Sequence, residues 1–495
     1  MAGKVTLVGA GPGDAGLLTI KGYEVLKKAE VVVYDRLVSK DILSIIPENA
    51  EKIDAGKKSA SHKIPQKEIN RLLLKKALEG KNVVRLKGGD CYLFGRGGEE
   101  LELLSENNID FEVVPGITSA LAVPAYAGIP VTHRDFVSSV HIITGHQKKD
   151  EPLKINFKNC VECNGTLVFL MGVANIDKIM NGLIENGMNI NMPCGVIEQG
   201  TTPCQKKVIA TISTIGKKCR ENNINSPAVI IVGEVCTLSE KFDWFNRLPL
   251  KGKSIVVTRP RDRAGSLTKK LRNLGANVIE YPCIETISMV NDSYIEIIID
   301  KIKSCNWIVF TSPAGVKAVF ECLSKRKLDG RFLAGTKIAV IGSGTYSELE
   351  KYALYPDLMP ESYDGKNLGA LLGKKAKEEK VLLLRAKDGS TEIIDELNKA
   401  EIEYEDMAVY YTIYTKKHSD ELTEKIKNGD IDYVTFTSAS TVKAFAATID
   451  GGYDKFKGLC IGEKTNTEAL RYGIKTIVSK NAAIDDMVRT LVREM

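Results

Sequence analysis

Short runs rich in valine and isoleucine alternate with amphipathic, helix-like stretches along almost the whole chain. The first cycle is VTLVG, LLTIKGYEVLKKA and EVVVYD, and a later cycle is KNVVRLKGG, GGEELELLSENN and FEVVPG. Such alternation is typical of strands that pair in parallel through helical crossovers. Glycine, proline and aspartate follow several of these runs, at the strand ends where parallel sheets place their ligands. The sequence therefore predicts an α/β fold with parallel sheets.

The length of the chain indicates more than one domain. Its 495 residues exceed what one hydrophobic core normally serves. The segment FDWFNRLPLKGKS, residues 242–254, combines two aromatic residues and a proline after the strand-like run AVIIVG. A new strand with its own turn begins directly afterwards, at SIVVTRPRDRAG. We therefore expect a domain boundary at about residue 250.

An internal echo occurs in the second half alone. The segment IVFTSPAGVKAVF (308–320) resembles VTFTSASTVKAFA (434–446), and each copy is followed by a strand with a Gly-x-x-Thr turn, at 340–349 and 460–470. This repetition predicts two related α/β lobes with a ligand between them. The alternative is that serine and threonine recur only because they cap helices well.

Charge and cysteine content exclude several functional classes. There are 69 basic and 63 acidic residues and a net charge of +6, without a long basic run, which favours an anionic small molecule and no nucleic-acid partner. No apolar run approaches the roughly 20 residues of a membrane span, and the N-terminus lacks a signal-peptide pattern. Eleven scattered cysteines fit a reducing compartment, so we expect a cytoplasmic protein without a membrane partner. The single CxxC pair, Cys160 and Cys163, has no further ligands nearby, so we expect no metal site.

The segment VTLVGAGPGDAGLLTIKG (5–22) places a glycine-rich turn between a strand and a helix. Its glycines permit close backbone approach, and Asp35 stands where the acid of a dinucleotide-binding fold would stand. Pro12, however, removes a backbone N–H, and the carboxylate of Asp14 would repel a diphosphate. These two residues oppose an NAD-dependent oxidoreductase and favour a ligand without phosphates. A purely structural turn capped by Asp14 is the alternative.

Further motifs follow in a definite order. LKGGDCYLFGRGGEE (86–100) brings a second glycine pair and Asp90 after a strand, and VVPGITSALAVPAYAGIPVTHRD (113–135) offers Thr118, Ser119 and Arg134. TGH (144–146) and the FLMG containing Met171 come next. On these motifs, together with VVYDRLVS and LVFLMG, residues 3 to about 246 resemble the tetrapyrrole methylases, in particular their uroporphyrinogen-III C-methyltransferase branch.

This resemblance implies a fold, a reaction and a cofactor. The fold is that of the tetrapyrrole methylases, with two α/β subdomains at about 1–114 and 115–246 within residues 1–246 and with the cofactor in the cleft between them. The reaction is the transfer of methyl groups from S-adenosylmethionine to C2 and C7 of uroporphyrinogen III, through precorrin-1 to precorrin-2. The implied assembly is a homodimer formed through this half.

Residue roles also come from the resemblance. The implied cofactor-binding residues are Pro12, Gly88, Gly89, Asp90, Leu93, Thr118, Ser119, Met171 and Gly200. Asp35 and Lys57 match positions with acid/base roles, while Arg96, Glu99 and Arg134 match positions associated with the tetrapyrrole. A carboxylate or a tuned lysine can accept the proton that leaves the macrocycle, and the guanidinium fork fits the substrate's carboxylates. Asp35 as a plain strand-end acid and Lys57 as a loop cation stay open as alternatives, and Cys91 departs from the proline that is common in this family.

Residues 252–495 resemble the uroporphyrinogen-III synthases, through IVVTRPRDRAGSLTKKLRNLGANVIEYPCIE, WIVFTSPAGVKAVF, AVIGSGT, MAVYYTIY and CIGEKT. The implied fold has two α/β lobes joined by a two-stranded connector, with lobe one at about 252–283 and 413–495 and lobe two at about 284–412. The implied reaction closes hydroxymethylbilane to uroporphyrinogen III, with loss of water and inversion of ring D.

For this half the resemblance suggests a proton donor and a set of substrate-binding groups. Tyr410 is the candidate donor, and packing of its ring in the connector is the alternative. Helix starts would bind the substrate's carboxylates through Thr311, Ser312, Thr345, Thr437, Ser438 and Thr465. Helix capping alone is the alternative for these six, and Arg259 and Arg385 are further carboxylate candidates.

Two functional hypotheses follow. The first is a bifunctional enzyme of tetrapyrrole biosynthesis in which the second half makes the substrate of the first. The second is an active methyltransferase whose two-lobed half binds or senses a tetrapyrrole without turnover. The sequence leaves open whether the pathway ends in sirohaem, a cobalamin-type corrinoid or another modified tetrapyrrole.

Overall fold

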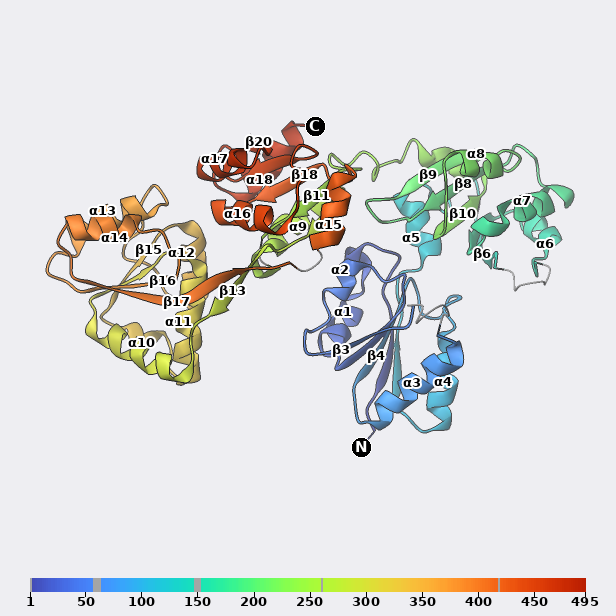
Figure 1. Ribbon diagram of the computed structural model, residues 1–495. Coiled ribbons are helices and arrows are strands. Elements are labelled where there is room, and N and C mark those ends of the chain that lie inside the picture. The colour runs from blue at the N-terminus through green and yellow to red at the C-terminus, as the bar shows by residue number, and fades with distance from the viewer. Residues whose placement is uncertain (1, 57–63, 147–152, 260, 417–418) are drawn as a thin grey trace. The chain divides into compact units, whose positions relative to one another are not determined.

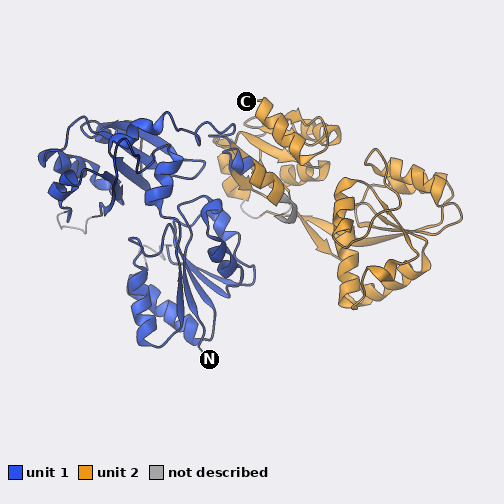
Figure 2. Cartoon of the chain, turned by 180° about the vertical axis from the view of Figure 1, so that it is seen from behind, with its two compact units in different colours: residues 1–253, 271–277, 495 blue, residues 254–270, 278–494 orange. Residues whose placement is uncertain are grey.

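The computed structural model describes residues 2–56, 64–146, 153–259, 261–416 and 419–495. The chain divides into two compact units, residues 1–253 with 271–277 and 495, and residues 254–270 with 278–494 (Figure 2). Four five-stranded sheets flanked by helices make up these units (Figure 1). The predicted α/β class, with two subdomains in one half and two lobes in the other, is confirmed.

The first sheet consists of five parallel strands in the order β3-β2-β4-β1-β5. Its strands are β1 (Val5–Gly9), β2 (Val31–Tyr34), β3 (Glu51–Asp54), β4 (Val83–Lys87) and β5 (Phe111–Val114). The helical segments around it are η1 (Ala15–Leu17), α1 (Ile20–Lys27), α2 (Lys40–Leu43), α3 (Gln66–Leu78) and α4 (Gly97–Glu106).

Burial on both faces explains why β1 is apolar apart from Thr6. Val5 and Leu7 pack with Leu73 on one face of the sheet, and Val8 packs with Leu26 on the other. Successive side chains of a strand point to opposite faces, so a strand with helices on both sides needs apolar residues throughout.

The second sheet has the order β6-β7-β10-β8-β9 and is mixed. Its strands are β6 (Val140–Thr144), β7 (Thr166–Leu170), β8 (Pro193–Glu198), β9 (Lys206–Thr211) and β10 (Ala228–Val232). Only β6 and β7 pair in parallel, so the expectation of parallel sheets is wrong here. The connection from β8 to β9, residues 199–205, is too short for a crossover and therefore joins antiparallel neighbours. Its helical segments are α5 (Ser119–Tyr126), α6 (Phe157–Glu162), η2 (Val173–Asn175), α7 (Ile176–Glu185), α8 (Ile215–Glu221) and η3 (Glu234–Ser239).

The third sheet belongs to the first lobe of the second unit and has the order β12-β11-β18-β19-β20. Its strands are β11 (Ser254–Val257), β12 (Asn277–Glu280), β18 (Tyr433–Phe436), β19 (Lys457–Cys460) and β20 (Lys475–Val478). Its helices are α9 (Arg261–Asn273), α15 (Ser419–Lys427), α16 (Ala439–Thr448), α17 (Glu463–Arg471) and α18 (Ile484–Arg493).

The fourth sheet forms the second lobe, in the order β13-β17-β16-β14-β15. Its strands are β13 (Ile284–Ser288), β14 (Trp307–Phe310), β15 (Lys337–Val340), β16 (Val381–Ala386) and β17 (Tyr404–Tyr414). Its helical segments are α10 (Asp292–Ser304), α11 (Pro313–Lys325), η4 (Gly330–Leu333), α12 (Ser343–Glu350), α13 (Gly365–Lys375) and α14 (Glu392–Lys399). The antiparallel pair β13 and β17, with Ile284 opposite Tyr414, is the predicted two-stranded connector (Figure 1).

The internal echo corresponds to equivalent elements in the two lobes. β14 and α11 in one lobe match β18 and α16 in the other, and β15 and α12 match β19 and α17. The serine before each first helix caps it: Ser312 Oγ accepts the N–H of Gly315 and Ser438 Oγ accepts the N–H of Thr441, both at 3.2 Å. Two related lobes and serine caps are therefore both present.

Candidate functional site

The nine residues expected around a cofactor all lie on the first unit, on segments that follow strands. They are Pro12 after β1, Gly88, Gly89, Asp90 and Leu93 after β4, Thr118 and Ser119 after β5, Met171 after β7 and Gly200 after β8. Because β4, β1 and β5 are parallel neighbours, the first three of these segments meet at one edge of the first sheet.

Two glycine-rich loops pair with each other at this edge. The N–H of Gly11 donates to the carbonyl of Gly89 at 3.1 Å, and the N–H of Gly89 donates back to the carbonyl of Gly11 at 2.8 Å. Both residues have a positive φ, +77° and +69°, which glycine adopts without strain. A Cβ added at Gly89 would meet only the backbone nitrogen of Ser119, at 4.0 Å. The space in front of Gly89 is therefore open, as a ligand in close contact with the backbone requires.

Asp90 organises the second of these loops. Its Oδ1 accepts the N–H groups of Tyr92 and Leu93, both at 2.8 Å, and its Oδ2 accepts the N–H of Gly116 at 3.0 Å. A carboxylate offers about four acceptor positions, so one remains for a ligand. The neighbouring Cys91 is buried, and burial raises the pKa of its thiol to about 11. The Asp90 carboxylate thus fixes the loop on either side of Cys91 through three backbone N–H groups.

Asp14 is a helix cap, as the structural alternative proposed, and it has two further partners. Its Oδ1 accepts the N–H of Gly16 at 2.7 Å at the start of η1. Its Oδ2 accepts the O–H of Tyr126 at 2.8 Å, and its own N–H donates to Thr201 Oγ1 at 3.3 Å. Burial and the adjacent Asp14 carboxylate raise the pKa of Tyr126, so its hydroxyl stays a donor. Sequence reasoning missed Tyr126 and Thr201, because no local pattern signals a contact over more than a hundred residues.

Asp35, at the end of β2, is held by a buried network of charges. Arg85 Nη2 lies 2.5 Å from Asp35 Oδ1, and Arg85 Nε lies 3.1 Å from Glu100 Oε1. Lys87 Nζ and Gln66 Nε2 contact the same Glu100 oxygen at 2.8 and 2.9 Å. Arg85, Lys87 and Glu100 are at most 4 % exposed, and buried charges are tolerated only when paired in this way.

The network was not predicted, although the sequence carried a signal for it. Arg85 and Lys87 occupy alternate positions of the otherwise apolar strand VVRLK, so both side chains point to one face. The second predicted acid/base residue, Lys57, lies outside the described residues.

Arg96 and Glu99, expected to bind the tetrapyrrole, pair with each other at the surface. Arg96 Nε and Nη2 contact the two carboxylate oxygens of Glu99 at 2.9 and 2.7 Å, and this hydrogen-bonded pairing lowers the pKa of Glu99. Both side chains are about half exposed. Arg134 is also exposed, in the segment before β6.

Thr118, Met171 and Gly200 have distinct local roles. Thr118 Oγ1 accepts the N–H of Ala120 at 3.3 Å and caps α5. Met171 has a φ of +57° and is 51 % exposed. A Cβ at Gly200 would lie 2.3 Å from Val123 Cγ1, so only glycine lets the segment between β8 and β9 pack on α5.

In the second unit, Tyr410 and Ser312 come together. Tyr410 lies in β17 and is 9 % exposed, and its hydroxyl is 2.8 Å from Ser312 Oγ at the start of α11. Thr311 immediately precedes Ser312, while Thr437 and Ser438 hold the equivalent place before α16 in the other lobe. The candidate proton donor thus contacts a candidate substrate-binding hydroxyl.

Two of the expected threonines and one arginine are buried. Thr345 and Thr465 lie in the first turns of α12 and α17 and are 2 % and 4 % exposed. Arg385 contacts both carboxylate oxygens of Asp406 at 2.7 Å and donates to the carbonyl of Ser390 at 2.8 Å. Its guanidinium is therefore committed to the fold, and the geometry gives no support to a role in binding substrate.

The remaining expectations concern metal and membrane. Cys163 Sγ lies 3.1 Å from the carbonyl of Cys160, and burial raises the pKa of the Cys160 thiol. Within the described ranges, no group of three or more metal-ligating side chains comes together. Nor does any helix in the described part of the chain have the length and apolar character to cross a membrane.

Comparison with known proteins gives two family matches. Residues 4–216 match the model of the tetrapyrrole (corrin/porphyrin) methylases, and residues 265–489 match the model of uroporphyrinogen-III synthase HemD. A protein of Ruminiclostridium josui described as porphyrin biosynthesis protein HemD is 48 % identical over 99 % of this chain and 98 % of its own length.

Two other relatives match part of the chain. A uroporphyrinogen-III C-methyltransferase of Bacillus subtilis (strain 168) is 42 % identical over 73 % of this chain and 74 % of its own length. Among solved structures, a uroporphyrin-III C-methyltransferase from Thermus thermophilus complexed with S-adenyl homocysteine is 39 % identical. It covers 48 % of this chain and 100 % of its own, with a TM-score of 0.42.

Proposed function

Because the chain belongs to the tetrapyrrole methylases through its first half and to the uroporphyrinogen-III synthases through its second, we propose that it catalyses two consecutive steps of tetrapyrrole biosynthesis. We assign residues 252–495 to the synthase and residues 1–246 to the methyltransferase. The observation that carries this proposal is the fusion itself, since the product of one family's reaction is the substrate of the other's.

In the synthase half, hydroxymethylbilane would lose water, invert ring D and close to uroporphyrinogen III. The hydroxyl group leaves as water once it receives a proton, and Tyr410 is the proposed donor. Ser312, 2.8 Å from the Tyr410 hydroxyl, is placed to return a proton to it. The other requirement is to hold a flexible octacarboxylate so that inversion outpaces direct closure, and the helix starts after Thr311 and Ser312 and after Thr437 and Ser438 are suited to bind its carboxylates.

In the methyltransferase half, the proposed reaction is methylation of uroporphyrinogen III at C2 and C7, through precorrin-1 to precorrin-2. S-adenosylmethionine supplies a methyl group already activated by its sulfonium. The residues of the first unit fit such a group: Gly89 leaves open space at its backbone, and Pro12 offers a pyrophosphate no N–H. We propose that Gly88, Gly89, Asp90, Leu93, Thr118, Ser119, Met171 and Gly200 complete its binding site with Pro12.

The side chains of the chain have three tasks in this reaction. Asp35, held by Arg85, is the proposed acceptor of the proton that the macrocycle loses. Lys57 is proposed as its acid/base partner. Arg96 and Arg134 are exposed cations suited to the carboxylates of the tetrapyrrole, with Glu99 holding Arg96 in place until the substrate binds.

We also propose an oligomeric state and a cellular location for the protein. We propose a homodimer formed through the methyltransferase half, which a mass measurement in solution would test. All eleven cysteines lie within the described residues and are free thiols, which supports a cytoplasmic location. The product would be a precursor of sirohaem or of a corrinoid.

The two half-reactions can be tested separately on the full chain. Uroporphyrinogen III with methyl-labelled S-adenosylmethionine is expected to give a doubly methylated product, and hydroxymethylbilane alone is expected to give isomer III. Asp35→Asn should abolish the first reaction and spare the second, and Tyr410→Phe should do the reverse. Loss of both activities in either variant, with the fold intact, would contradict two separate sites.

A further inference from the structure

The segment that ends the first compact unit, just before the synthase half begins, packs on α5. We call residues 242–251 the linker segment; all of them lie in the first unit. Trp244 Nε1 donates to the carbonyl of Ala125 at 3.0 Å. The rings of Trp244 and Phe245 lie 4.9 and 5.0 Å from the ring of Tyr126, within the range of favourable aromatic contacts. Tyr126, at the end of α5, is thus held by the linker segment.

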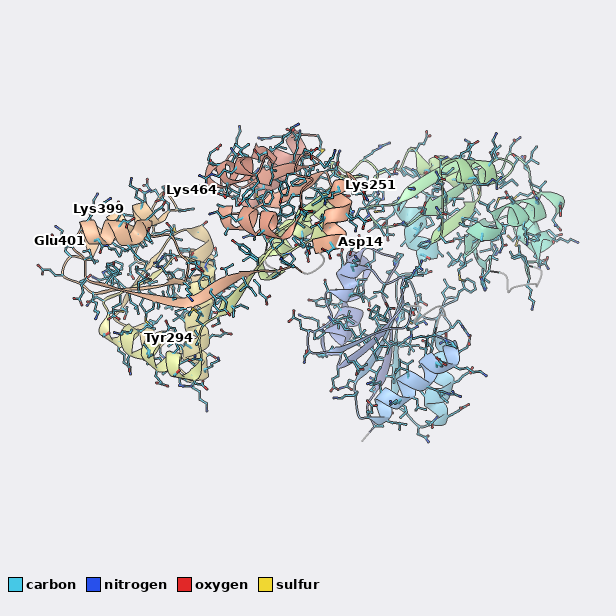
Figure 3. All side chains as sticks on the ribbon, in the orientation of Figure 1. Asp14, Lys251, Tyr294, Lys399, Glu401 and Lys464 are labelled. Carbon is cyan, nitrogen blue, oxygen red and sulfur yellow. The ribbon has the colours of Figure 1, made fainter. Side chains whose placement is uncertain are left out.

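Lys251 ties the end of the linker segment to the connection between β8 and β9. Its Nζ donates to the carbonyls of Pro203 and Thr202 at 2.7 and 3.3 Å and lies 4.4 Å from the centre of the Phe245 ring. Burial lowers the pKa of Lys251 to about 8. Lys251 is labelled in Figure 3. Its half-buried ammonium group fixes the connection between β8 and β9 through the two carbonyls, although burial disfavours the charge.

The same connection contacts the loop that carries Pro12. Thr201 Oγ1 accepts the N–H of Asp14, and a Cβ at Gly13 would lie 2.7 Å from Thr202 Cγ2. Gln205 connects this segment with Tyr126. Its Oε1 accepts the N–H of Thr201 at 2.9 Å, and its Nε2 donates to the carbonyl of Tyr126 at 3.1 Å.

Both routes from the linker segment end at Asp14. One runs through the Tyr126 hydroxyl to the Asp14 carboxylate, and the other runs through Thr201 to the Asp14 N–H. We propose that Tyr126 is a positioning residue for the methyl-donor loop, residues 10–16, and that the linker segment sets its position. The affinity of the methyltransferase for its donor then depends on the segment that leads to the synthase. This inference rests on the proposed function, because the loop positions a donor only if one binds there.

The test compares the full-length chain with Tyr126→Phe, Trp244→Leu and Lys251→Met. Tyr126→Phe keeps the ring and removes only the hydroxyl. Its control is Tyr294→Phe, which removes a hydroxyl that donates to the carbonyl of Ala408 at 3.0 Å in the second unit (Figure 3). The probe is S-adenosylhomocysteine, titrated calorimetrically. Amide hydrogen exchange of residues 10–16 is followed without ligand.

Tyr126→Phe is expected to weaken S-adenosylhomocysteine about tenfold, as loss of one hydrogen bond to a carboxylate implies. Trp244→Leu and Lys251→Met should weaken it roughly two- to fivefold, since they loosen Tyr126 and the β8–β9 connection without removing a loop contact. Exchange in residues 10–16 should quicken in all three variants, while the KM for uroporphyrinogen III stays unchanged. If Tyr126 had only a structural role, the affinity for S-adenosylhomocysteine and the KM for uroporphyrinogen III would change together.

The outcomes separate the inference from the proposed function. Binding to Tyr126→Phe as tight as to the wild type, with unchanged exchange in residues 10–16, would overturn the inference and leave the function intact. A wild-type chain that fails to bind S-adenosylhomocysteine would overturn the proposed cofactor, and the inference with it. Equal weakening by Tyr294→Phe would show a general effect on the fold and would also overturn the inference.

Discussion

Arg85 Nη2 lies 2.5 Å from Asp35 Oδ1, although Arg85 itself is 2 % exposed and Asp35 stands at the edge of the sheet. The same guanidinium reaches inward to Glu100, which also pairs with Lys87. A buried arginine thus links the proposed proton acceptor to the interior of the first sheet. This pairing holds the carboxylate of Asp35, in the loop just after β2, against a buried side chain of the sheet.

The first prediction concerns Arg85→Lys. Lysine keeps the positive charge but cannot reach Asp35 and Glu100 at once as the guanidinium fork does. We expect kcat for methylation to fall roughly 10- to 100-fold, while uroporphyrinogen III formation stays unchanged. Steady-state kinetics of both half-reactions measures this. Arg85→Met, by contrast, should lower the free energy of unfolding of the first unit by about 3–5 kcal/mol, because it leaves Glu100 with one buried cation. Urea unfolding measures this loss. Full methylation by Arg85→Lys would contradict the role given to Arg85.

The second prediction concerns Tyr410→Phe. Removal of the proposed donor should slow hydroxymethylbilane consumption by about 10²- to 10⁴-fold, so that spontaneous closure to isomer I dominates. Ser312→Ala should have a smaller effect, about tenfold, because Tyr410 keeps its hydroxyl. Isomer analysis of the products measures both. Methylation of added uroporphyrinogen III is the internal control, and a Tyr410→Phe chain that still makes isomer III rapidly would exclude Tyr410 as donor.

The third prediction compares three glycines. Gly89→Ala places a methyl group in open space, so the fold should lose only about 1–2 kcal/mol from the left-handed backbone, yet donor binding should be lost. Gly116→Ala should prevent folding of the first unit, because its Cβ would lie 2.3 Å from the carbonyl of Gly89. Gly98→Ala, in α4 with nothing within 4 Å, is the harmless control. Calorimetric titration and thermal unfolding give the two readouts. Normal donor binding by Gly89→Ala would place the donor elsewhere.

The fourth prediction follows from the pKa of Lys251, which burial lowers to about 8. In the folded chain this amine should be mostly neutral by pH 9, so its acetylation rate should level off there. The same residue in the urea-unfolded chain should still react faster as the pH rises toward 10, near the ordinary lysine pKa of about 10.4. Peptide-resolved mass spectrometry measures both rates. Superimposable pH profiles in the two states would contradict the effect of burial.

The lowered pKa of Lys251 makes the free energy of unfolding depend on pH. Between about pH 8 and pH 10 the unfolded chain binds a proton at Lys251 that the folded chain has released, so Lys251 makes stability rise with pH. Lys251→Met should remove that rise, which is on the order of 1 kcal/mol once solvent screening is allowed for. Urea unfolding of both chains at pH 8 and pH 10 measures the difference.

The sequence predicted the folds and the loops of the candidate site more fully than it predicted the contacts among them. The α/β class and the lobes followed from alternation and from the echo, because burial on both faces of a parallel strand leaves a readable apolar run. The antiparallel part of the second sheet was missed, since residues 199–205 carry no pattern that separates a short hairpin connection from a longer loop.

For the candidate site, the sequence predicted the glycine-rich loops but not the contacts that position them. The glycines at 11 and 89 were readable, because close approach and positive φ require glycine. The contacts that position the site, Tyr126 to Asp14 and Arg85 to Asp35, join residues 112 and 50 positions apart. Tertiary contacts of this length depend on how strands are ordered, and local sequence does not encode that order.

The most direct test of the two-step assignment is a single incubation. The purified full-length chain is given hydroxymethylbilane and methyl-labelled S-adenosylmethionine, and the products are separated by isomer and by methyl content. We expect a doubly methylated type III tetrapyrrole, and isomer III without label when the donor is omitted. Isomer I as the sole product, or isomer III that stays unlabelled with the donor present, would contradict it.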